Sequence, residues 1–305
     1  MNRRTVATPL LDIGYLEAGD PDGPVAVLMH GFPYDAHACV EAGGLLAAEG
    51  WHVLAPWLRG FGPTTFLSSA TTRSGEQAAL GADLLAFLDA LGVERATLAG
   101  YDWGGRAACV VSALWPARVA GLISGNGYNI FSAELMLKPA PPDQERRFWY
   151  SLYLQSPRGE AGLAQYTRPF TRLLWEQWSP NWHFSDATFE RSAAAFDNPD
   201  FVPVVIHSYR HRYGLASGDP AYAEFEERLS TRPVLDVPTV LMVSEGGLQR
   251  DFTSDTSQFS RLVDRVHVDG GHNLIQENPA EVVAAFRLLR DGGSATSRPE
   301  GRVTV

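Results

Sequence analysis

The sequence predicts an α/β fold with a mostly parallel central sheet, helices on both faces and an inserted helical cap. Short apolar runs lack the polar alternation of an exposed sheet, as is typical of buried parallel strands. Helical patterns separate these runs, and strand–helix alternation favours a sheet covered on both faces. The alternation stops in the middle of the chain, which indicates an insertion. With 305 residues, the chain is long enough for one large domain that carries such an insertion.

Six apolar runs are predicted strands, and they cover residues 25–29, 52–55, 96–99, 119–124, 239–243 and 265–268. The clearest predicted helix lies between the second and third runs, over residues 75–91. Its leucines recur at helical spacing, with Leu80, Leu84 and Leu88 on one face, and Gly92 is a typical helix stop. These elements form a core that we expect to comprise residues 1–129 and 233–290.

Residues 130–232 interrupt the core and are predicted to form the helical cap. The segment is helical in pattern and rich in aromatic residues, which are Phe148, Trp149, Tyr150, Tyr153, Trp175, Trp178, Trp182 and Phe184. The strand pattern then resumes at Val237. The tail over residues 291–305 is polar and rich in glycine, and we expect it to be disordered.

Composition excludes several classes of function. The net charge is −10, and no concentrated basic face of the kind that binds nucleic acid is visible. No run approaches the roughly 18 apolar residues of a membrane span, and the first residues lack the apolar core of a signal peptide. Cys39 and Cys109 do not form a CxxC pair, and the eight histidines are scattered without a metal-binding spacing. We therefore expect a cytoplasmic protein without metal or other cofactor, whose oligomeric state stays open.

One turn carries the strongest chemical signal. Residues 96–110 have the pattern of a strand, a tight turn and a helix, with Asp102 at the tip and glycines at positions 100, 104 and 105. A nucleophile elbow needs small neighbours because its backbone is strained and the helix packs closely behind it. A carboxylate in this position can attack carbon and form an ester that water then cleaves. The alternatives are a helix N-cap and a phosphate-binding loop, in which Asp102 and Trp103 would crowd an anion.

His272 is the candidate base that would activate this water. It lies in the segment Asp269-Gly270-Gly271-His272-Asn273, directly after the last predicted strand. That places it at the carboxyl edge of the sheet, where open α/β folds bind ligands. Its position after Asp102 in the chain is the order that an elbow-type active site requires. A surface or structural histidine is the alternative.

A second loop at the same edge is a candidate oxyanion hole. The segment His30-Gly31-Phe32-Pro33 follows the first apolar run. The backbone amides of Phe32 and Trp103 could together bind a developing negative charge. The alternative is an ordinary turn at the end of a strand, and the Trp103 side chain could equally belong to the core.

Together these segments resemble a known group of enzymes. Residues 30–33, 58–62, 100–105 and 270–279 look like the epoxide hydrolase and haloalkane dehalogenase branch of the α/β-hydrolase superfamily, and the resemblance runs from about residue 10 to 290. It implies the α/β-hydrolase fold with Asp102 as nucleophile and His272 as the base that lets water cleave the ester.

Two cap tyrosines favour the epoxide hydrolases within this branch. Residues 150–155 and 207–210 resemble the two tyrosine motifs of these enzymes, with Tyr150 and Tyr209 at the functional positions. An opening epoxide develops an alkoxide that needs a proton, and a phenol can donate one. Packing in an aromatic cap is the alternative for both residues. We also expect Trp103, Trp149 and His30 to contact the substrate.

The acid that orients the histidine is the irregular part of the pattern. Its usual family position falls on Gly247, which has no carboxylate. Residues 250–252 resemble the sequence around the family acid, so we favour Asp251 over Glu245. The other family location, over residues 126–129, also lacks a carboxylate.

The resulting prediction is an epoxide hydrolase that opens an apolar or aromatic epoxide to a diol through an aspartyl ester. The aromatic cap favours a bulky apolar small molecule as substrate. One alternative is a haloalkane or fluoroacetate-type dehalogenase that uses the same aspartate, since a halide can leave toward Trp or Asn donors. The other is a non-hydrolytic binding protein, because a fold alone does not determine function.

Overall fold

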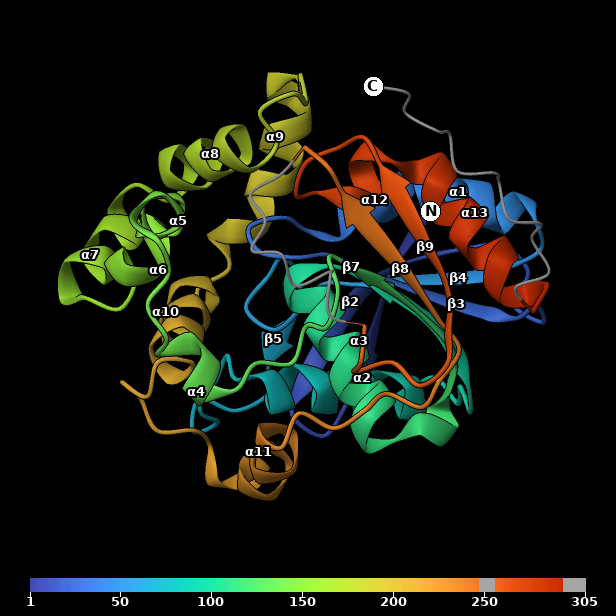
Figure 1. The fold of residues 1–305 in the computed structure, drawn as a ribbon, viewed down its shortest axis with the longest axis horizontal. Coiled ribbons are helices and arrows are strands. Elements are labelled where there is room, and N and C mark those ends of the chain that lie inside the picture. The colour runs from blue at the N-terminus through green and yellow to red at the C-terminus, as the bar shows by residue number, and fades with distance from the viewer. Residues whose placement is uncertain (247–255, 293–305) are drawn as a thin grey trace, which may run out of the picture.

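A computed structural model of the chain describes residues 1–246 and 256–292, and these residues form a central sheet flanked by helices (Figure 1). The strands are β1 (Asn2–Ala7), β2 (Leu11–Ala18), β3 (Val25–Met29), β4 (His52–Pro56), β5 (Thr65–Phe66), β6 (Ala96–Gly100), β7 (Val119–Gly125), β8 (Thr239–Ser244) and β9 (Leu262–Val268). Their order across the sheet is β1-β2-β4-β3-β6-β7-β8-β9, and β5 pairs with β2. The pairs from β4 to β9 are parallel, which confirms the predicted α/β fold.

The six predicted strands correspond to β3, β4 and β6 to β9, whereas the three remaining strands did not stand out in the sequence. β1 and β2 form an antiparallel pair, and β2 also pairs antiparallel with β4. β1 is almost entirely exposed and β5 spans two residues. Such strands lack the continuous apolar run by which a strand buried on both faces is recognised.

Two layers of helices cover the sheet. One layer holds α1 (Val40–Ala48) and α13 (Pro279–Arg290), which contact each other, and the other holds α2 (Gln77–Ala90) and α3 (Asp102–Leu114). In α2 the predicted face is buried, with Leu80, Leu84 and Leu88 almost without exposure, and Gly92 follows the helix with φ 68°. The predicted helix over residues 75–91 is thus confirmed to within two residues at each end.

Helices α4 to α11 occupy the chain between β7 and β8, where the sequence predicts the cap, and α5 to α9 stand to one side of the sheet (Figure 1). They are α4 (Ala133–Met136), α5 (Pro142–Arg147), α6 (Trp149–Tyr153), α7 (Pro157–Gln165), α8 (Thr167–Trp178), α9 (Asp186–Ala193), α10 (Phe201–His211) and α11 (Ala223–Ser230). Short 3₁₀ turns lie at Ala36–Cys39, Pro116–Arg118, Ala194–Asp197 and Pro220–Tyr222. The helix α12 (Leu274–Glu277) follows β9. Of the predicted disordered tail, residues 293–305 lie outside the described residues.

Buried and partly buried hydrogen bonds join the helices between β7 and β8, where the cap is predicted, to the rest of the chain. The indole of Trp175 in α8 donates to the Pro33 carbonyl at 2.7 Å. The amide of Asn198 donates to the carbonyls of Gly62 and Thr64 at 2.9 and 2.8 Å. The carboxylate of Glu226 in α11 accepts from the backbone amide of Ala78 at 2.8 Å, where α2 begins. The loops beneath the cap are therefore fixed against it.

The strand order places the predicted site residues at one edge of the sheet. β3 and β6 are adjacent and parallel, so the loops that follow them, over residues 30–33 and at Asp102, emerge side by side. The strand order reverses here, and a reversal of this kind opens a crevice at the carboxyl ends of the strands. In the described part of the chain, no helix is both long and apolar enough to cross a membrane.

Candidate active site

The turn after β6 holds Asp102 in a strained backbone conformation. Asp102 has φ 50°, in the left-handed region that a residue with a side chain rarely adopts. Such a conformation costs on the order of 1–3 kcal/mol and persists only where the surroundings enforce it. A Cβ atom on Gly100 would lie 2.5 Å from the Gly104 carbonyl carbon, and one on Gly104 would lie 2.5 Å from the Met29 carbonyl oxygen. Only glycine fits these two positions, as the elbow interpretation requires.

Asp102 does not act as the N-cap of α3. The N-cap is Tyr101, and no side chain caps this end of the helix. Instead, Oδ1 of Asp102 accepts a hydrogen bond from the Phe32 amide at 2.7 Å, and Oδ2 lies 3.9 Å from Nε2 of His272. Trp103 is the second residue of α3, and amides in the first turn of a helix have no partner within the helix. Of the two predicted oxyanion-hole residues, Phe32 thus contacts the Asp102 carboxylate through its amide, and Trp103 follows Asp102 in the first turn of α3.

The loop that carries His272 is held by a carboxylate that the sequence analysis did not single out. Glu277 accepts hydrogen bonds from the amides of Gly271 and Asn273 at 2.7 and 2.9 Å, and from the Ser179 hydroxyl at 2.6 Å. Ser179 in turn accepts from the His272 amide at 3.0 Å. The sequence feature that could have identified Glu277 is its place five residues after His272, within the segment 270–279. Glu277 therefore ties the histidine loop to the cap.

Aromatic rings surround His272 and control its protonation. Its ring centroid lies 4.6 Å from that of Trp178 and 5.7 Å from that of Tyr34. Burial lowers the pKa of His272 below its ordinary value, and the negative charge of Asp102 opposes this effect. The imidazole is consequently neutral near pH 7, which is the form that can accept a proton from water.

Tyr150 and Tyr209 line the same cavity as the Asp102 carboxylate. They come from α6 and α10, and their ring centroids lie 5.8 Å apart. Both line one cavity of about 110 Å³ together with Asp102 and His272. Burial raises the pKa of both phenols above the ordinary value, and the charge of Asp102 adds to the effect. The phenols therefore stay protonated and can act as hydrogen-bond and proton donors.

Three residues predicted to contact the substrate do not line the cavity that contains Asp102. Trp103 is 0% exposed and stacks on Phe32 in the core. His30 is also fully buried, and its Nε2 accepts from the Leu58 amide at 3.1 Å. Trp149 packs against Phe170, and its indole donates to Gln177 near the surface. None of the three lies in the cavity wall.

The cavity wall consists of other residues from the cap and the adjoining loops. Its apolar part combines Tyr128, Phe131, Met136, Phe148 and Trp178. The polar part includes Arg106 and Arg212, to which the sequence analysis gave no role. Trp178 and Phe148 belong to the aromatic cap residues noted in the sequence. However, the abundance of aromatic residues could not indicate which rings face the carboxylate, because that depends on the rotation of each cap helix.

The orienting acid for His272 stays a prediction. The favoured candidate, Asp251, lies outside the described residues. The carboxylate of Glu245 contacts Nδ1 of His267 at 2.8 Å in an exposed position, and no contact joins it to His272. Asn126, at the alternative family location, accepts from the Ser244 amide at 3.2 Å. Within residues 1–246 and 256–292, Nδ1 of His272 is buried without a hydrogen-bond partner.

No group of three or more potential metal ligands occurs among the residues that the structure describes.

Comparison with known proteins shows which fold and family the chain resembles. The family profile described as the alpha/beta hydrolase fold matches residues 24–165. The chain is 34% identical to Epoxide hydrolase A of Mycobacterium tuberculosis, over 93% of this chain and 95% of that protein. A candidate epoxide hydrolase from Klebsiella pneumoniae superposes with a TM-score of 0.92 at 40% identity, over 96% of this chain and 98% of the other. Epoxide Hydrolase A from Mycobacterium thermoresistibile shares the fold, with a TM-score of 0.74 at 23% identity over 95% and 98% of the two chains.

Proposed function

Because this chain belongs to the epoxide-hydrolase-like family of the α/β hydrolases and is a hydrolase, we propose that it opens an epoxide to a diol through an ester on Asp102. The observation that carries the proposal is the meeting of two protonated phenols, Tyr150 and Tyr209, with the Asp102 carboxylate in one cavity. A strained epoxide needs a nucleophile on carbon and a proton donor on oxygen, and this cavity contains both.

The first step forms the ester. The Asp102 carboxylate attacks a ring carbon with Oδ2, and the carbon–oxygen bond of the epoxide breaks. The departing oxygen takes a proton from Tyr150 or Tyr209, so no free alkoxide builds up. The hydrogen bond from the Phe32 amide occupies Oδ1, which leaves Oδ2, the oxygen that faces His272, to attack.

The second step cleaves the ester with water. Neutral His272 takes one proton from water, and the oxygen of that water adds to the carboxyl carbon of Asp102. The amides of Phe32 and Trp103 stabilise the oxyanion that forms on Oδ1. As the carbon–oxygen ester bond breaks, the histidine returns its proton to the leaving diol oxygen. The second water proton restores the phenol, so the sum is epoxide plus water giving diol.

We assign Asp251 as the acid that orients His272 in this scheme. Nδ1 of His272 is buried and lacks a partner in the described part of the chain, while Glu245 contacts His267. An imidazole that works as a base through Nε2 is oriented by an acceptor at Nδ1. The apolar part of the cavity wall supports a small molecule with an apolar or aromatic body as the substrate.

Isotope labelling tests the ester directly. With enzyme in excess over a styrene-oxide-type substrate in ¹⁸O-water, a single turnover should yield a diol without ¹⁸O and an Asp102 peptide that carries it. Direct attack of water on the epoxide would put ¹⁸O into the diol and would refute the ester. Asp102→Asn should lose diol formation, whereas Asp143→Asn, at an exposed position in α5, should retain it.

A dehalogenase is the second candidate function, and one observation favours it. Trp178 lines the cavity, and its indole N–H is buried without a hydrogen-bond partner in the described residues. An unpaired indole N–H can stabilise a departing halide. Halide release should be assayed on chloro-, bromo- and fluoro-substrates in parallel with the epoxide. Release of halide without epoxide turnover would replace the epoxide proposal with this one.

A further inference from the structure

Arg106 is a buried cation next to the nucleophile. It lies in α3 one helical turn after Asp102, and its residue surface is 2% exposed. Its Nε atom is buried without a hydrogen-bond partner, and no ion pair joins Arg106 to any residue that the structure describes. Burial of an unpaired guanidinium is unfavourable, so buried charges are as a rule paired with an opposite charge. The proposed reaction uses no cation at this position.

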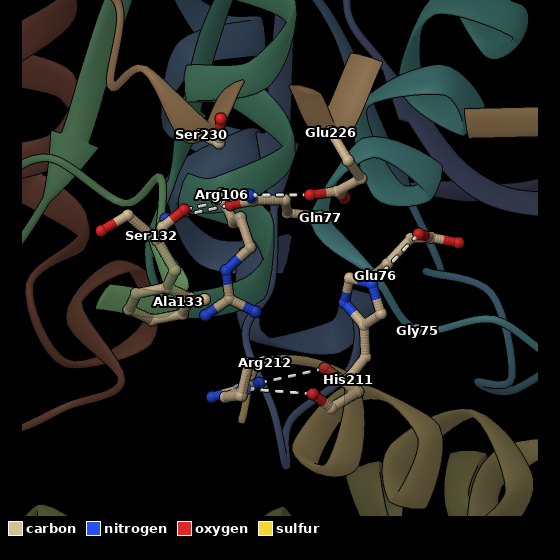
Figure 2. Close-up of a pocket in the computed structure, with 12 residues that line it drawn as sticks. Gly75, Glu76, Gln77, Arg106, Ser132, Ala133, His211, Arg212, Glu226 and Ser230 are labelled. Carbon is tan, nitrogen blue, oxygen red and sulfur yellow. Dashed lines mark hydrogen bonds and ion pairs between the residues drawn. The ribbon is translucent and has the colours of Figure 1, made fainter. Parts of the chain in front are cut away.

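Arg106 separates two neighbouring cavities. It lines the cavity that contains Asp102, and it also lines an adjacent one of about 210 Å³. Arg212 and Phe131 are shared by the two cavities in the same way. Figure 2 shows the Arg106 side chain extending toward Arg212 among the residues that surround the adjacent cavity. The two guanidinium groups therefore belong to the wall of the proposed active site.

Arg212 is held in place by neutral groups. Its Nε and Nη2 donate to the carbonyl and the hydroxyl of Ser208 at 3.2 and 3.0 Å. Its guanidinium carbon lies 4.2 Å from the centroid of the Tyr209 ring and 5.2 Å from that of Phe131. Arg106 approaches the same Phe131 ring at 4.2 Å. One aromatic ring thus supports both cations, and neither cation has a carboxylate partner in the described residues.

The nearby acids do not neutralise this pair. Glu226 uses its two carboxylate oxygens on the Ala78 amide and the Gln77 side chain, at 2.8 and 3.1 Å. Asp102 is held by Phe32 and faces His272. Burial and the charge of Arg212 lower the pKa of Arg106 to about 9, although Asp102, Tyr209 and Glu226 act in the opposite direction. A bound anion would relieve this repulsion between two like charges.

From this arrangement we propose that Arg106 and Arg212 form a carboxylate subsite of the active-site cavity, so that the substrate is an epoxide with an apolar body and a carboxylate end. The inference rests on the proposed function. Asp102 and Arg106 are four residues apart on one helix, where neighbouring Cβ atoms lie about 5–6 Å apart. A carboxylate a few bonds from the epoxide ring can therefore bind the guanidinium groups while Asp102 reaches a ring carbon.

A matched pair of substrates tests the subsite. The probes are trans-5-phenyl-4,5-epoxypentanoate and its primary amide, which differ in charge but hardly in size. We expect kcat/KM to be at least roughly tenfold higher for the acid, because charge-assisted hydrogen bonds are the stronger ones. Arg106→Met and Arg212→Met should each remove most of this preference while changing the amide far less. Arg212 is partly exposed. Arg212→Met therefore tests the subsite even if Arg106→Met fails to fold.

The control is Arg210→Met, which removes a guanidinium near the end of α10, two residues before Arg212 and outside the cavity, where Arg210 pairs with Glu160. It should leave the ratio of acid to amide unchanged. Equal kcat/KM values for acid and amide in the wild type would overturn the subsite. The proposed function would still stand if turnover of the amide in ¹⁸O-water places ¹⁸O on Asp102.

If neither epoxide is turned over, the proposed function fails. The carboxylate subsite is then tested separately, by measuring ligand binding. Calorimetry would then compare 4-phenylbutanoate with 4-phenylbutanamide on the wild type and Arg212→Met. Tighter binding of the acid that is lost in the variant supports the subsite. Equal affinities for the two ligands overturn it.

Discussion

Nε2 of His272 lies 3.9 Å from Oδ2 of Asp102, while the Phe32 amide donates to the other carboxylate oxygen. The two oxygens of Asp102 are therefore different before any substrate binds. One is held in the candidate oxyanion hole, and the other faces the base. This asymmetry suits an ester on Oδ2 whose carboxyl carbon is open to water activated by His272.

Replacement of His272 should separate the two chemical steps. In His272→Gln we expect Asp102 to form the ester and then fail to hydrolyse it, because no base activates water. Intact-mass spectrometry after mixing with an epoxide should show one covalent adduct per chain, and tryptic mapping should locate it at residue 102. His183→Gln, at an exposed position, should accumulate no adduct. Multiple turnovers without an adduct in His272→Gln would contradict the assignment.

The two phenols should affect the alkylation step. Tyr150→Phe and Tyr209→Phe should each lower kcat on the order of tenfold to a hundredfold, and the double variant should lose most activity, because proton donation to the alkoxide is removed. The measurement is the rate of ester formation under single-turnover conditions. Tyr166→Phe, which is exposed in the cap, is the matched control. An unchanged rate in both single variants and in the double variant would refute the donor role.

The pKa shifts predict how the rate depends on pH. His272 acts as a neutral base, and burial lowers its pKa, so activity should fall only as the pH drops below about 6.5. The tyrosines act as acids, and their pKa values are raised, so their ionisation should cause no alkaline limb below pH 10. Esterification removes the negative charge of Asp102, which otherwise raises the pKa of His272. His272 should therefore titrate at a lower pH in the ester intermediate than in the free enzyme, and the rate of ester hydrolysis should fall only at that lower pH. A stopped-flow pH profile of both steps would check these directions, and an acid limb centred above pH 7 would contradict them.

Glu277 is predicted to position the histidine without touching the substrate. Glu277→Gln keeps an acceptor but weakens the hydrogen bonds to Gly271 and Asn273, so kcat should fall while KM changes little. A shift in the pH at which His272 is protonated, seen as a shifted acid limb of the rate profile, would indicate a positioning effect. A loss of folded protein would lower the rate without this shift. Glu281→Gln, which is exposed in α13, should behave as the wild type. A loss of thermal stability with kcat unchanged would assign Glu277 a structural role only.

Two acid variants should identify the orienter of His272. Asp251→Asn is expected to slow ester hydrolysis on the order of a hundredfold or more, because the imidazole loses its charged acceptor. Glu245→Gln should have little effect on this step, since Glu245 pairs with His267 at the surface. The rate of adduct decay after a single turnover is the quantity to compare. The reverse order of the two effects would favour Glu245 as the acid.

The sequence by itself determined the parallel part of the sheet, the elbow at Asp102 and the loop of His272. Buried parallel strands are continuous apolar runs, and the turn at residues 100–105 demands glycine through its own backbone geometry, so both signals are local. The exposed strand β1 has no such signal and was missed, as was β2, whose apolar side chains are interrupted by Asp12 and Gly14. The position of α2 could be predicted closely because its leucine spacing and Gly92 mark the buried face and the end of one helix.

Only the tertiary structure decided which side chains face the cavity. Trp103 follows Asp102 in sequence, yet its ring turns into the core, whereas Trp178, Arg106 and Arg212 reach the cavity from separate segments of the chain. The role of Glu277 also follows only from the tertiary structure, in which its carboxylate contacts both the histidine loop and Ser179. The physical reason is that a local pattern determines where a helix lies along the chain. Its rotation, and the charges it brings beside distant residues, result from packing between segments remote in sequence.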